Sequence, residues 1–270
     1  MSERPGTDLR GRGVVVTGAG NGIGRAMARR MAASGARVVV NDLDADAAEA
    51  VAAEIEGYAA PGDASSPDGV AHLVALARSE LGDIDVWFGN AGIERGHGLD
   101  AADEDWAAAY EVNVMAHVRA ARLLVPDWVG RGPGRAPGRF VVTASAAGLL
   151  TMLGSPTYSV SKHGAVAFAE WLSATYRHRG VVVQVICPQG VRTRMYEEAG
   201  PLKAVLSHDE VLTPEQVAEA AWQALDGDRF LVLPHPEVGA YYTARATDTD
   251  RWLGGMNRVQ QHLDTEAGER

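Results

Sequence analysis

Short runs of β-branched residues alternate along almost the whole chain with longer alanine-rich stretches, and this alternation constrains the fold more than any other feature. The runs are almost continuously apolar, which is typical of strands buried on both faces of a parallel sheet. The alanine-rich stretches are long enough to serve as right-handed helical crossovers between such strands. We therefore expect an α/β fold in which a doubly wound parallel sheet carries helices on both faces.

The expected elements follow one another in strict alternation. Strands are predicted at residues 14–17, 37–41, 57–61, 85–89, 139–144, 181–187 and 229–233. Helices are predicted at residues 22–34, 45–55, 67–81, 104–129, 158–178 and 214–226. Because no linker rich in Pro, Gly or Ser divides the 270 residues, we expect a single domain over residues 1–270 with about seven strands.

Two segments interrupt or follow this alternation. Residues 194–212 form an irregular insertion, which we expect to act as a substrate lid that closes Met195, Tyr196 and Leu202 over the ligand. Residues 240–263 are too apolar for a free tail, so we expect this C-terminal extension to dock on the body of the protein or on another subunit. Its apolar side chains are Tyr241, Tyr242, Trp252, Leu253, Met256, Val259 and Leu263.

Composition excludes several classes of partner. A formal net charge of -10 argues against nucleic acid and against an anionic membrane surface, since both require clustered Lys and Arg. No apolar span of membrane length and no apolar signal core is present, and the single cysteine, Cys187, lies in an apolar run, so we expect a cytoplasmic protein. The eight histidines show no His-x-x-x-His spacing, and we expect no metal site.

A glycine-rich turn joins the first expected strand to the first expected helix. Gly18, Gly22 and Gly24 have the spacing Gly-x-x-x-Gly-x-Gly, with Asn21 and Ile23 between them. Glycines in this position let a pyrophosphate approach the backbone at the helix N-terminus. No Gly-Lys-Ser/Thr follows, which disfavours a P-loop, and the remaining alternative is a tight structural turn.

Asp42 ends the second expected strand, close to where an acidic residue accepts hydrogen bonds from an adenosine ribose. A carboxylate there repels a 2′-phosphate, and neither Asn41 nor Leu43 offers a compensating positive charge. The expected cofactor is therefore NAD. The alternative is that Asp42 only caps the next helix, a role that Asp44 fills more naturally.

Three side chains suggest redox chemistry. Tyr158 and Lys162 are four residues apart, about one helical turn, so the ammonium can favour the phenolate and make the phenol a usable base. Ser145 precedes them and can position a substrate oxygen. Its surroundings lack Gly-x-Ser-x-Gly, which disfavours a serine hydrolase.

These motifs fall in the order found in the short-chain dehydrogenase/reductase family, which the chain resembles from about residue 12 to residue 233. The glycine turn is similar to the family's Thr-Gly-x-x-x-Gly-x-Gly, and Asn90-Ala91-Gly92 is similar to its Asn-Asn-Ala-Gly segment. The resemblance implies a Rossmann-type fold and a catalytic tetrad at Asn113, Ser145, Tyr158 and Lys162. The chain departs from the family pattern at Gly89, where the first asparagine is expected, and at Gln189, which separates Pro188 from Gly190.

The resemblance also implies individual roles. Asn113 would hold a water that links Lys162 to solvent, Lys162 would bind the nicotinamide ribose, and Thr193 would bond the nicotinamide carboxamide. Tyr158 and Lys162 would therefore be cofactor contacts as well as catalytic residues. The remaining expected cofactor contacts are Asp63, Ala64, Asn90, Ala91, Gly92, Pro188 and Val191.

The function expected from the sequence is an NAD-dependent oxidoreductase that interconverts a hydrophobic secondary alcohol and its ketone, with Tyr158 as acid/base. A hydrophobic, alicyclic or steroid-like substrate is expected because the residues near the site are apolar; these are Leu149, Leu150, Met152, Leu153, Met195 and Tyr196. The alternatives are a 3-oxoacyl thioester reductase and a non-catalytic NAD-binding regulator. A homotetramer or homodimer is expected, because the family commonly buries the helices at residues 104–129 and 158–178 against a symmetry mate.

Overall fold

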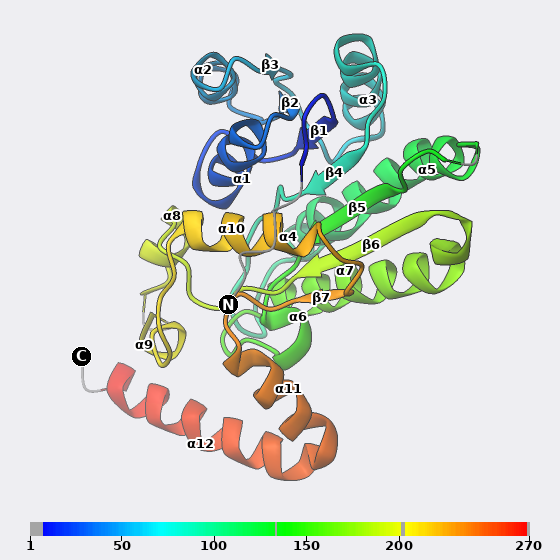
Figure 1. Cartoon of the computed structure of the whole chain (residues 1–270). Coiled ribbons are helices and arrows are strands. Elements are labelled where there is room, and N and C mark those ends of the chain that lie inside the picture. The colour runs from blue at the N-terminus through cyan, green and yellow to red at the C-terminus, as the bar shows by residue number, and fades with distance from the viewer. Residues whose placement is uncertain (1–7, 133, 201–202, 269–270) are drawn as a thin grey trace.

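A computed structural model describes residues 8–132, 134–200 and 203–268, and within them one sheet of seven parallel strands forms the centre of the molecule (Figure 1). The strands lie in the order β3-β2-β1-β4-β5-β6-β7. Their bounds are β1 Gly13–Val16, β2 Arg37–Val40, β3 Tyr58–Ala59, β4 Val86–Gly89, β5 Gly138–Thr143, β6 Val181–Ile186 and β7 Leu231–Val232. The predicted doubly wound sheet is confirmed, and β3 and β7 are shorter than expected because each lies at an edge and pairs on one side only.

Strand β1 shows why the central strands are apolar at every position. Val14 and Val16 pack beside Met27 in the core on one face of the sheet, whereas Val15 packs beside Leu73 in the core on the other face. Successive side chains of a strand point to opposite faces. A strand with helices on both faces therefore buries every side chain.

Helices cover both faces, as predicted (Figure 1). One core receives side chains from α1 Gly22–Ala33, α2 Ala45–Glu54 and α10 Pro214–Ala224. The other receives them from α3 Pro67–Leu81, α5 Ala116–Val129 and α7 Pro156–Tyr176. The remaining helical elements of the described residues are α4 Asp103–Tyr110, η1 Glu111–Met115, α6 Ala147–Leu150, η2 Arg177–Arg179, α8 Arg194–Glu197, α9 Lys203–Leu206, α11 Glu237–Thr247 and α12 Thr249–Gly268.

The expected continuous helix over residues 104–129 is wrong. The chain leaves regular α-geometry at η1, a π-helical turn between α4 and α5. Such turns occur inside helices at functional sites. The turn carries Asn113, whose side-chain amide bonds both backbone groups of Ile93, so a tertiary contact replaces regular helical geometry here.

Capping residues explain where two helices begin. The Ser66 hydroxyl accepts from Gly69 N at 3.1 Å, and α3 has the predicted bounds. Thr213 and Gln216 form a reciprocal capping box at the start of α10. By contrast, α7 begins two residues before its predicted start because Pro156 suits the first helical position.

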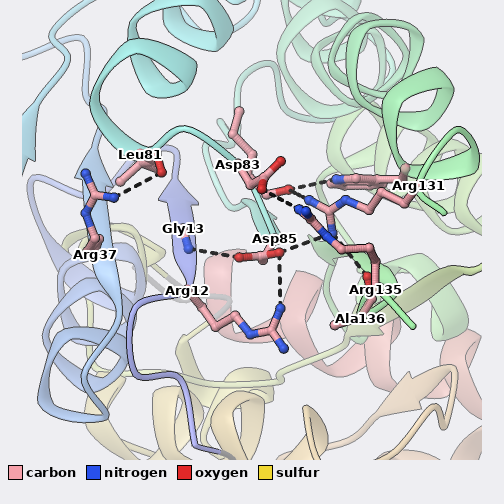
Figure 2. A network of polar contacts seen from close by, with 11 residues as sticks. Arg12, Gly13, Arg37, Leu81, Asp83, Asp85, Arg131, Arg135 and Ala136 are labelled. Atoms are coloured by element: carbon pink, nitrogen blue, oxygen red, sulfur yellow. Dashed lines mark hydrogen bonds and ion pairs between the residues drawn. The ribbon is translucent and has the colours of Figure 1, made fainter. Parts of the chain in front are cut away.

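A polar network fixes the amino ends of the central strands, away from the carboxyl ends where ligands bind in such sheets (Figure 2). The buried Asp85 carboxylate accepts from Gly13 N at 3.1 Å and pairs with Arg131 at 3.1 Å and Arg12 at 3.4 Å. Asp85 O accepts from Arg139 N at 2.9 Å. One residue therefore joins β1, β4 and β5, and it leaves the opposite edge free for chemistry.

The C-terminal extension divides into two helices. On α11, Val238 is fully buried and Tyr242 packs against the core, so this helix docks on the body of the protein. Figure 1 shows α12 leading away from the sheet, and it exposes Leu253 and Val259. The expected docking is thus confirmed for α11, whereas α12 contacts chiefly α11. No helix in the described ranges is both long and apolar enough to cross a membrane.

Candidate active site

A cavity of about 410 Å³ opens at the carboxyl ends of the strands. The chain turns in opposite directions after β1 and β4, which are neighbours in the sheet, and such a switch point is where ligands bind in open α/β sheets. The cavity is lined by every cofactor contact expected from the sequence. These are Gly18, Asn21, Gly22, Ile23, Gly24, Asp42, Asp63, Ala64, Asn90, Ala91, Gly92, Tyr158, Lys162, Pro188, Val191 and Thr193.

The glycine turn requires its glycines. Gly18 has φ +61°, and a Cβ on it would lie 2.8 Å from Ala91 Cα. A Cβ on Gly24 would lie 2.1 Å from Gly18 O. Side chains here would collide with the backbone of the turn and of the segment after β4, so only glycines allow this close packing before the N-terminus of α1. Such a backbone turn at a helix N-terminus is suited to a pyrophosphate.

Hydrogen bonds between Thr17 and Asn90 hold this turn in place, and these bonds could not be predicted from the sequence. The Thr17 hydroxyl accepts from the backbone N–H groups of Asn90 and Ala91, each at 3.0 Å. The Asn90 amide donates in return to Thr17 O at 3.1 Å and Gly18 O at 3.2 Å. The two segments that line the cavity therefore hold each other in place.

Asp42 lies at the far end of the cavity from Tyr158, after β2. Its carboxylate accepts from Gly20 N at 2.8 Å and from Asp44 N at 3.1 Å. Asp44, and not Asp42, caps α2 by accepting from Ala47 N at 3.1 Å. The capping alternative for Asp42 is wrong, and Asp42 instead links the glycine turn to the cavity wall.

Tyr158 and Lys162 both line the cavity from α7, and Ser145 faces them after β5. The Lys162 ammonium nitrogen lies 5.6 Å from the centroid of the Tyr158 ring and donates to Thr143 O at 2.9 Å. Tyr158 is 8% exposed and Lys162 is 3% exposed. The structure thus brings the expected catalytic groups together in a desolvated place.

Burial opposes the charged forms of both groups. It raises the pKa of the Tyr158 phenol to about 12, an effect that a hydrogen bond with Ser145 opposes and the charge of Glu94 reinforces. Burial also lowers the pKa of Lys162 to about 8. The expectation that Lys162 lowers the pKa of Tyr158 is not met by the protein alone, because desolvation is the dominant effect.

Asn113 is fully buried and does not line the cavity. Its Oδ1 accepts from Ile93 N and its Nδ2 donates to Ile93 O and to Ser161 Oγ, all at 2.9 Å. The side-chain amide is therefore committed to positioning the segment after β4. Both side-chain N–H groups of Asn113 are thus used, so the expected water would need one of its oxygen atoms as an acceptor.

The departure at Gly89 has a structural reason. A Cβ on Gly89 would lie 2.6 Å from His117 Nδ1, so the imidazole occupies the space of a side chain at residue 89. His117 is buried, and desolvation lowers its pKa to about 3, which keeps it neutral. A histidine on α5 replaces the asparagine of the family pattern.

The departure at Gln189 connects three parts of the chain. Gln189 lines the cavity and donates from Nε2 to Asp209 at 3.1 Å. Tyr241 of α11 donates to the same Asp209 carboxylate at 3.2 Å. The insertion at residues 194–212 is therefore bonded both to the cavity wall and to the C-terminal extension.

The expected substrate contacts are only partly correct. Met152, Met195 and Tyr196 line the cavity, but Leu149, Leu150 and Leu153 do not. Leu149 is instead buried in the core, because the short helix α6 turns it inward. Leu202 lies outside the described residues.

Several further residues that line the cavity were not predicted from the sequence, and Glu94 and Leu206 are among them. Glu94 follows Asn90-Ala91-Gly92-Ile93, and no local pattern in the sequence indicates that its side chain faces a cavity. Leu206 belongs to α9, which the sequence did not predict. Within the described ranges no group of His, Cys, Asp and Glu is arranged to hold a metal ion.

The fold and the cavity define a class, an oxidoreductase on a dinucleotide-binding sheet. Residues 12–203 match the family model described as short chain dehydrogenase. The chain is 37% identical over 238 residues to 1-deoxy-11-beta-hydroxypentalenate dehydrogenase of Streptomyces exfoliatus, and the alignment covers 85% of each protein. This protein belongs to the short-chain dehydrogenase family.

Solved structures agree with this assignment. A short chain dehydrogenase/reductase from Burkholderia phymatum in complex with NAD superposes with a TM-score of 0.82 at 28% identity, covering 90% of this chain and 96% of the other. A 3-ketoacyl-(acyl-carrier-protein) reductase from Brucella melitensis complexed with NADH gives a TM-score of 0.77 at 26% identity, covering 83% and 96%.

Proposed function

We propose that this protein is an NAD-dependent dehydrogenase that interconverts a hydrophobic secondary alcohol and its ketone, with Tyr158 as the acid/base. The observation that carries the proposal is one cavity lined both by Tyr158, Ser145 and Lys162 and by the glycine turn and Asp42, which follows β2, a strand that β1 and β4 separate from β5. The relative from Streptomyces exfoliatus is named as the dehydrogenase of a hydroxylated compound, and the Burkholderia phymatum structure contains NAD.

In the oxidation direction, Tyr158 takes the proton from the substrate hydroxyl while Ser145 donates a hydrogen bond to the same oxygen. When bound, NAD accepts the hydride and places a positive charge beside the phenol. Because the protein alone, chiefly through burial, raises the pKa of Tyr158 to about 12, this added charge and that of Lys162 are what make proton removal feasible near neutral pH.

Lys162 has one of its three ammonium protons committed to Thr143 O. The other two are available for the nicotinamide ribose and for the water expected at an oxygen atom of Asn113. Gly92 leaves this space open, because a Cβ on it would lie 3.0 Å from Lys162 Nζ and 3.2 Å from Asn113 Oδ1.

The cofactor preference rests on Asp42. Its carboxylate lies in the cavity wall with Asn41 and Leu43 beside it, and none of these side chains carries a positive charge. A 2′-phosphate would meet a negative charge there, which favours NAD over NADP. Thr193 lines the same cavity near its middle and is the proposed partner of the nicotinamide carboxamide.

The substrate end of the cavity combines Met152, Met195 and Leu206 with the phenol of Tyr158. Flexible apolar side chains of this kind accommodate an alicyclic body better than a sugar. Residues 194–212 are proposed as the lid over this body, in a single catalytic domain that spans residues 1–270.

A spectrophotometric assay tests the proposal. The protein is incubated with NAD or NADP and a panel of alicyclic secondary alcohols, and formation of reduced nicotinamide is followed. We expect turnover of at least one alicyclic alcohol and a higher kcat/KM with NAD. Absence of turnover with every alcohol and every matching ketone, despite measurable NAD binding, would favour the non-catalytic regulator instead.

A 3-oxoacyl thioester reductase is the second candidate, and the likeness to the Brucella melitensis reductase favours it. The net charge of -10 argues against it, because an acidic carrier protein requires a basic docking face. Faster NADH consumption with acetoacetyl thioesters than with any alicyclic ketone would select this candidate.

We also propose a cytoplasmic homotetramer or homodimer. Tyr110 is 49% exposed on α4, and Val160 and Trp171, about three helical turns apart on α7, are 55% and 56% exposed. Large apolar side chains on neighbouring helices form a surface suited to a second copy of the chain.

A further inference from the structure

Glu94 is a carboxylate in the substrate end of the cavity that lacks a firm partner. Its side chain is 13% exposed, and its Oε1 is buried without a hydrogen bond. The side chain recorded within ion-pairing distance of it, among the described residues, is that of His97, whose Nδ1 lies 3.7 Å away and which is 69% exposed. Desolvating a carboxylate without compensation is costly, so this oxygen is available to a donor that enters the cavity.

The backbone on both sides of Glu94 is fixed. Asn113 bonds both backbone groups of Ile93 at 2.9 Å. On the other side, Thr157 donates to Arg95 O and, at 3.1 Å, to Gly96 O. The backbone that carries Glu94 is therefore fixed by Thr157 of α7 and by Asn113 of the π-helical turn. Binding groups require preorganisation of this kind.

Arg95, Arg194 and Lys162 each have a partner other than Glu94. Arg95 lies 3.5 Å from Asp105, and Lys162 donates to Thr143 O. Arg194, which also lines the cavity, is 87% exposed and pairs with Glu198. Among the residues that the structure describes, only the exposed His97 is recorded as an ion-pair partner of Glu94.

We propose that Glu94 determines specificity by accepting a hydrogen bond from a second hydroxyl group of the substrate, next to the CH–OH group that Tyr158 oxidises. The second hydroxyl lies at the reacting end because Glu94 and Tyr158 line the same cavity, and Thr157, next to Tyr158, donates to the backbone carbonyl of Arg95, next to Glu94. A neutral hydroxyl fits better than an ammonium, since Lys162 and the oxidised nicotinamide place positive charge at the same end. The substrate class is thus an apolar alicyclic compound with neighbouring hydroxyls. This inference rests on the proposed function.

The test compares cyclohexanol with trans-1,2-cyclohexanediol, which differ by the proposed hydroxyl. Dissociation constants are measured by ligand-observed NMR on the enzyme–NADH complex, where no oxidation occurs, and kcat/KM is measured with NAD. Glu94→Leu should reduce the preference for the diol at least about 10-fold, as expected for a hydrogen bond to a charged group. Glu94→Gln retains an acceptor and should reduce it less. Asp100→Asn removes an exposed carboxylate from the same connection and serves as the matched control, with unchanged preference.

The pH dependence of kcat/KM provides a second measurement, which would not change if Glu94 had only a structural role. Glu94→Gln should shift the rise of kcat/KM for oxidation to lower pH, because the Glu94 charge raises the pKa of Tyr158. The other titratable groups that act on the phenol or face it, Cys187 and Lys162, stay in place.

An unchanged diol preference in Glu94→Leu, in binding and in turnover, would overturn the inference, as would an unshifted pH profile in Glu94→Gln. The binding comparison needs no turnover. It therefore separates failure of this inference from failure of the proposed function. If the proposed function is wrong, the diol will bind but NAD will not be reduced.

Discussion

At the scale of single residues, Tyr158 and Lys162 are held in an environment that favours the neutral form of both. Burial raises the pKa of the phenol to about 12 and lowers the pKa of the ammonium to about 8. Both shifts have the same cause, the loss of hydration of a charge. A positive charge from a bound cofactor would favour the phenolate of Tyr158, and it would also lower the pKa of Lys162 further.

Lys162→Met should stabilise the fold while it weakens NAD binding. At pH 7 the folded protein holds a buried ammonium that the unfolded chain hydrates better, so its removal should add on the order of 1 kcal/mol after loss of the bond to Thr143 O. The gain should shrink as pH rises from about 8 toward 10.5, because Lys162 then loses its proton in the fold before it does in the unfolded chain. Thermal unfolding at pH 7 and pH 10 measures this, and an equal gain at both values would contradict it.

Asp42→Ala should narrow the preference for NAD over NADP. The substitution removes the charge that repels the 2′-phosphate, and it also removes the bond to Gly20 N, so affinity for NAD should fall by about 3- to 30-fold. Ratios of kcat/KM for the two cofactors report the effect, with Asp44→Ala as the helix-cap control. A parent enzyme that is faster with NADP would refute the role of Asp42.

The sequence identified most residues that meet at the cavity, because each lies in a local motif with fixed spacing. It missed contacts that depend on tertiary packing. The imidazole of His117 explains Gly89, yet the two residues are distant in sequence and no local pattern joins them. Glu94 was missed for the same reason, since a lone carboxylate after a motif gives no sign of whether it faces solvent or a cavity.

At the scale of elements, the proposed lid, residues 194–212, is anchored at both ends. A parallel bridge between Val191 and Leu212 joins its two stems, and the Tyr241–Asp209 bond ties it to α11. Inside it, the Tyr196 hydroxyl meets Ser207 Oγ at 2.7 Å. The segment thus contains the short helices α8 and α9 on a fixed base, an arrangement suited to opening and closing.

Binding of NAD together with an alcohol should slow backbone hydrogen exchange across residues 194–212. Tyr241→Phe should speed exchange near Asp209 in the ligand-free protein, because the lid loses its bond to α11. Tyr242→Phe, on the neighbouring residue that packs against the core, provides the control. Equal protection with and without ligands would mean that the segment is a fixed wall.

Element boundaries followed from the sequence where capping residues or strand periodicity specified them, as at α3. The predicted boundaries were wrong where a tertiary contact altered the geometry of a helix. Propensity alone favours one continuous helix through Asn113, and only the contact with Ile93 explains the π-helical turn. The helices α8 and α9 were also missed, because four-residue helices carry too short a period to detect.

At the scale of the whole molecule, the exposed apolar surface of α4 and α7 predicts self-association. We expect a homotetramer or homodimer by light scattering at micromolar concentration. Trp171→Asp should shift the protein toward a smaller species, since it places a charge in the centre of that surface, whereas Leu253→Asp on α12 tests the C-terminal extension separately. A monomeric parent protein would contradict the proposal.

The central claim is that Tyr158 transfers the substrate proton in an NAD-dependent oxidation, and Tyr158→Phe tests it most directly. The substitution removes the phenolic oxygen and leaves the ring packing in place, so NAD should bind within about 3-fold of the parent affinity while kcat falls by at least ~10². The measurement is turnover of the best alicyclic alcohol by parent and variant, with NAD affinity determined by calorimetry on the same preparations. Near-parental turnover in Tyr158→Phe would contradict the account.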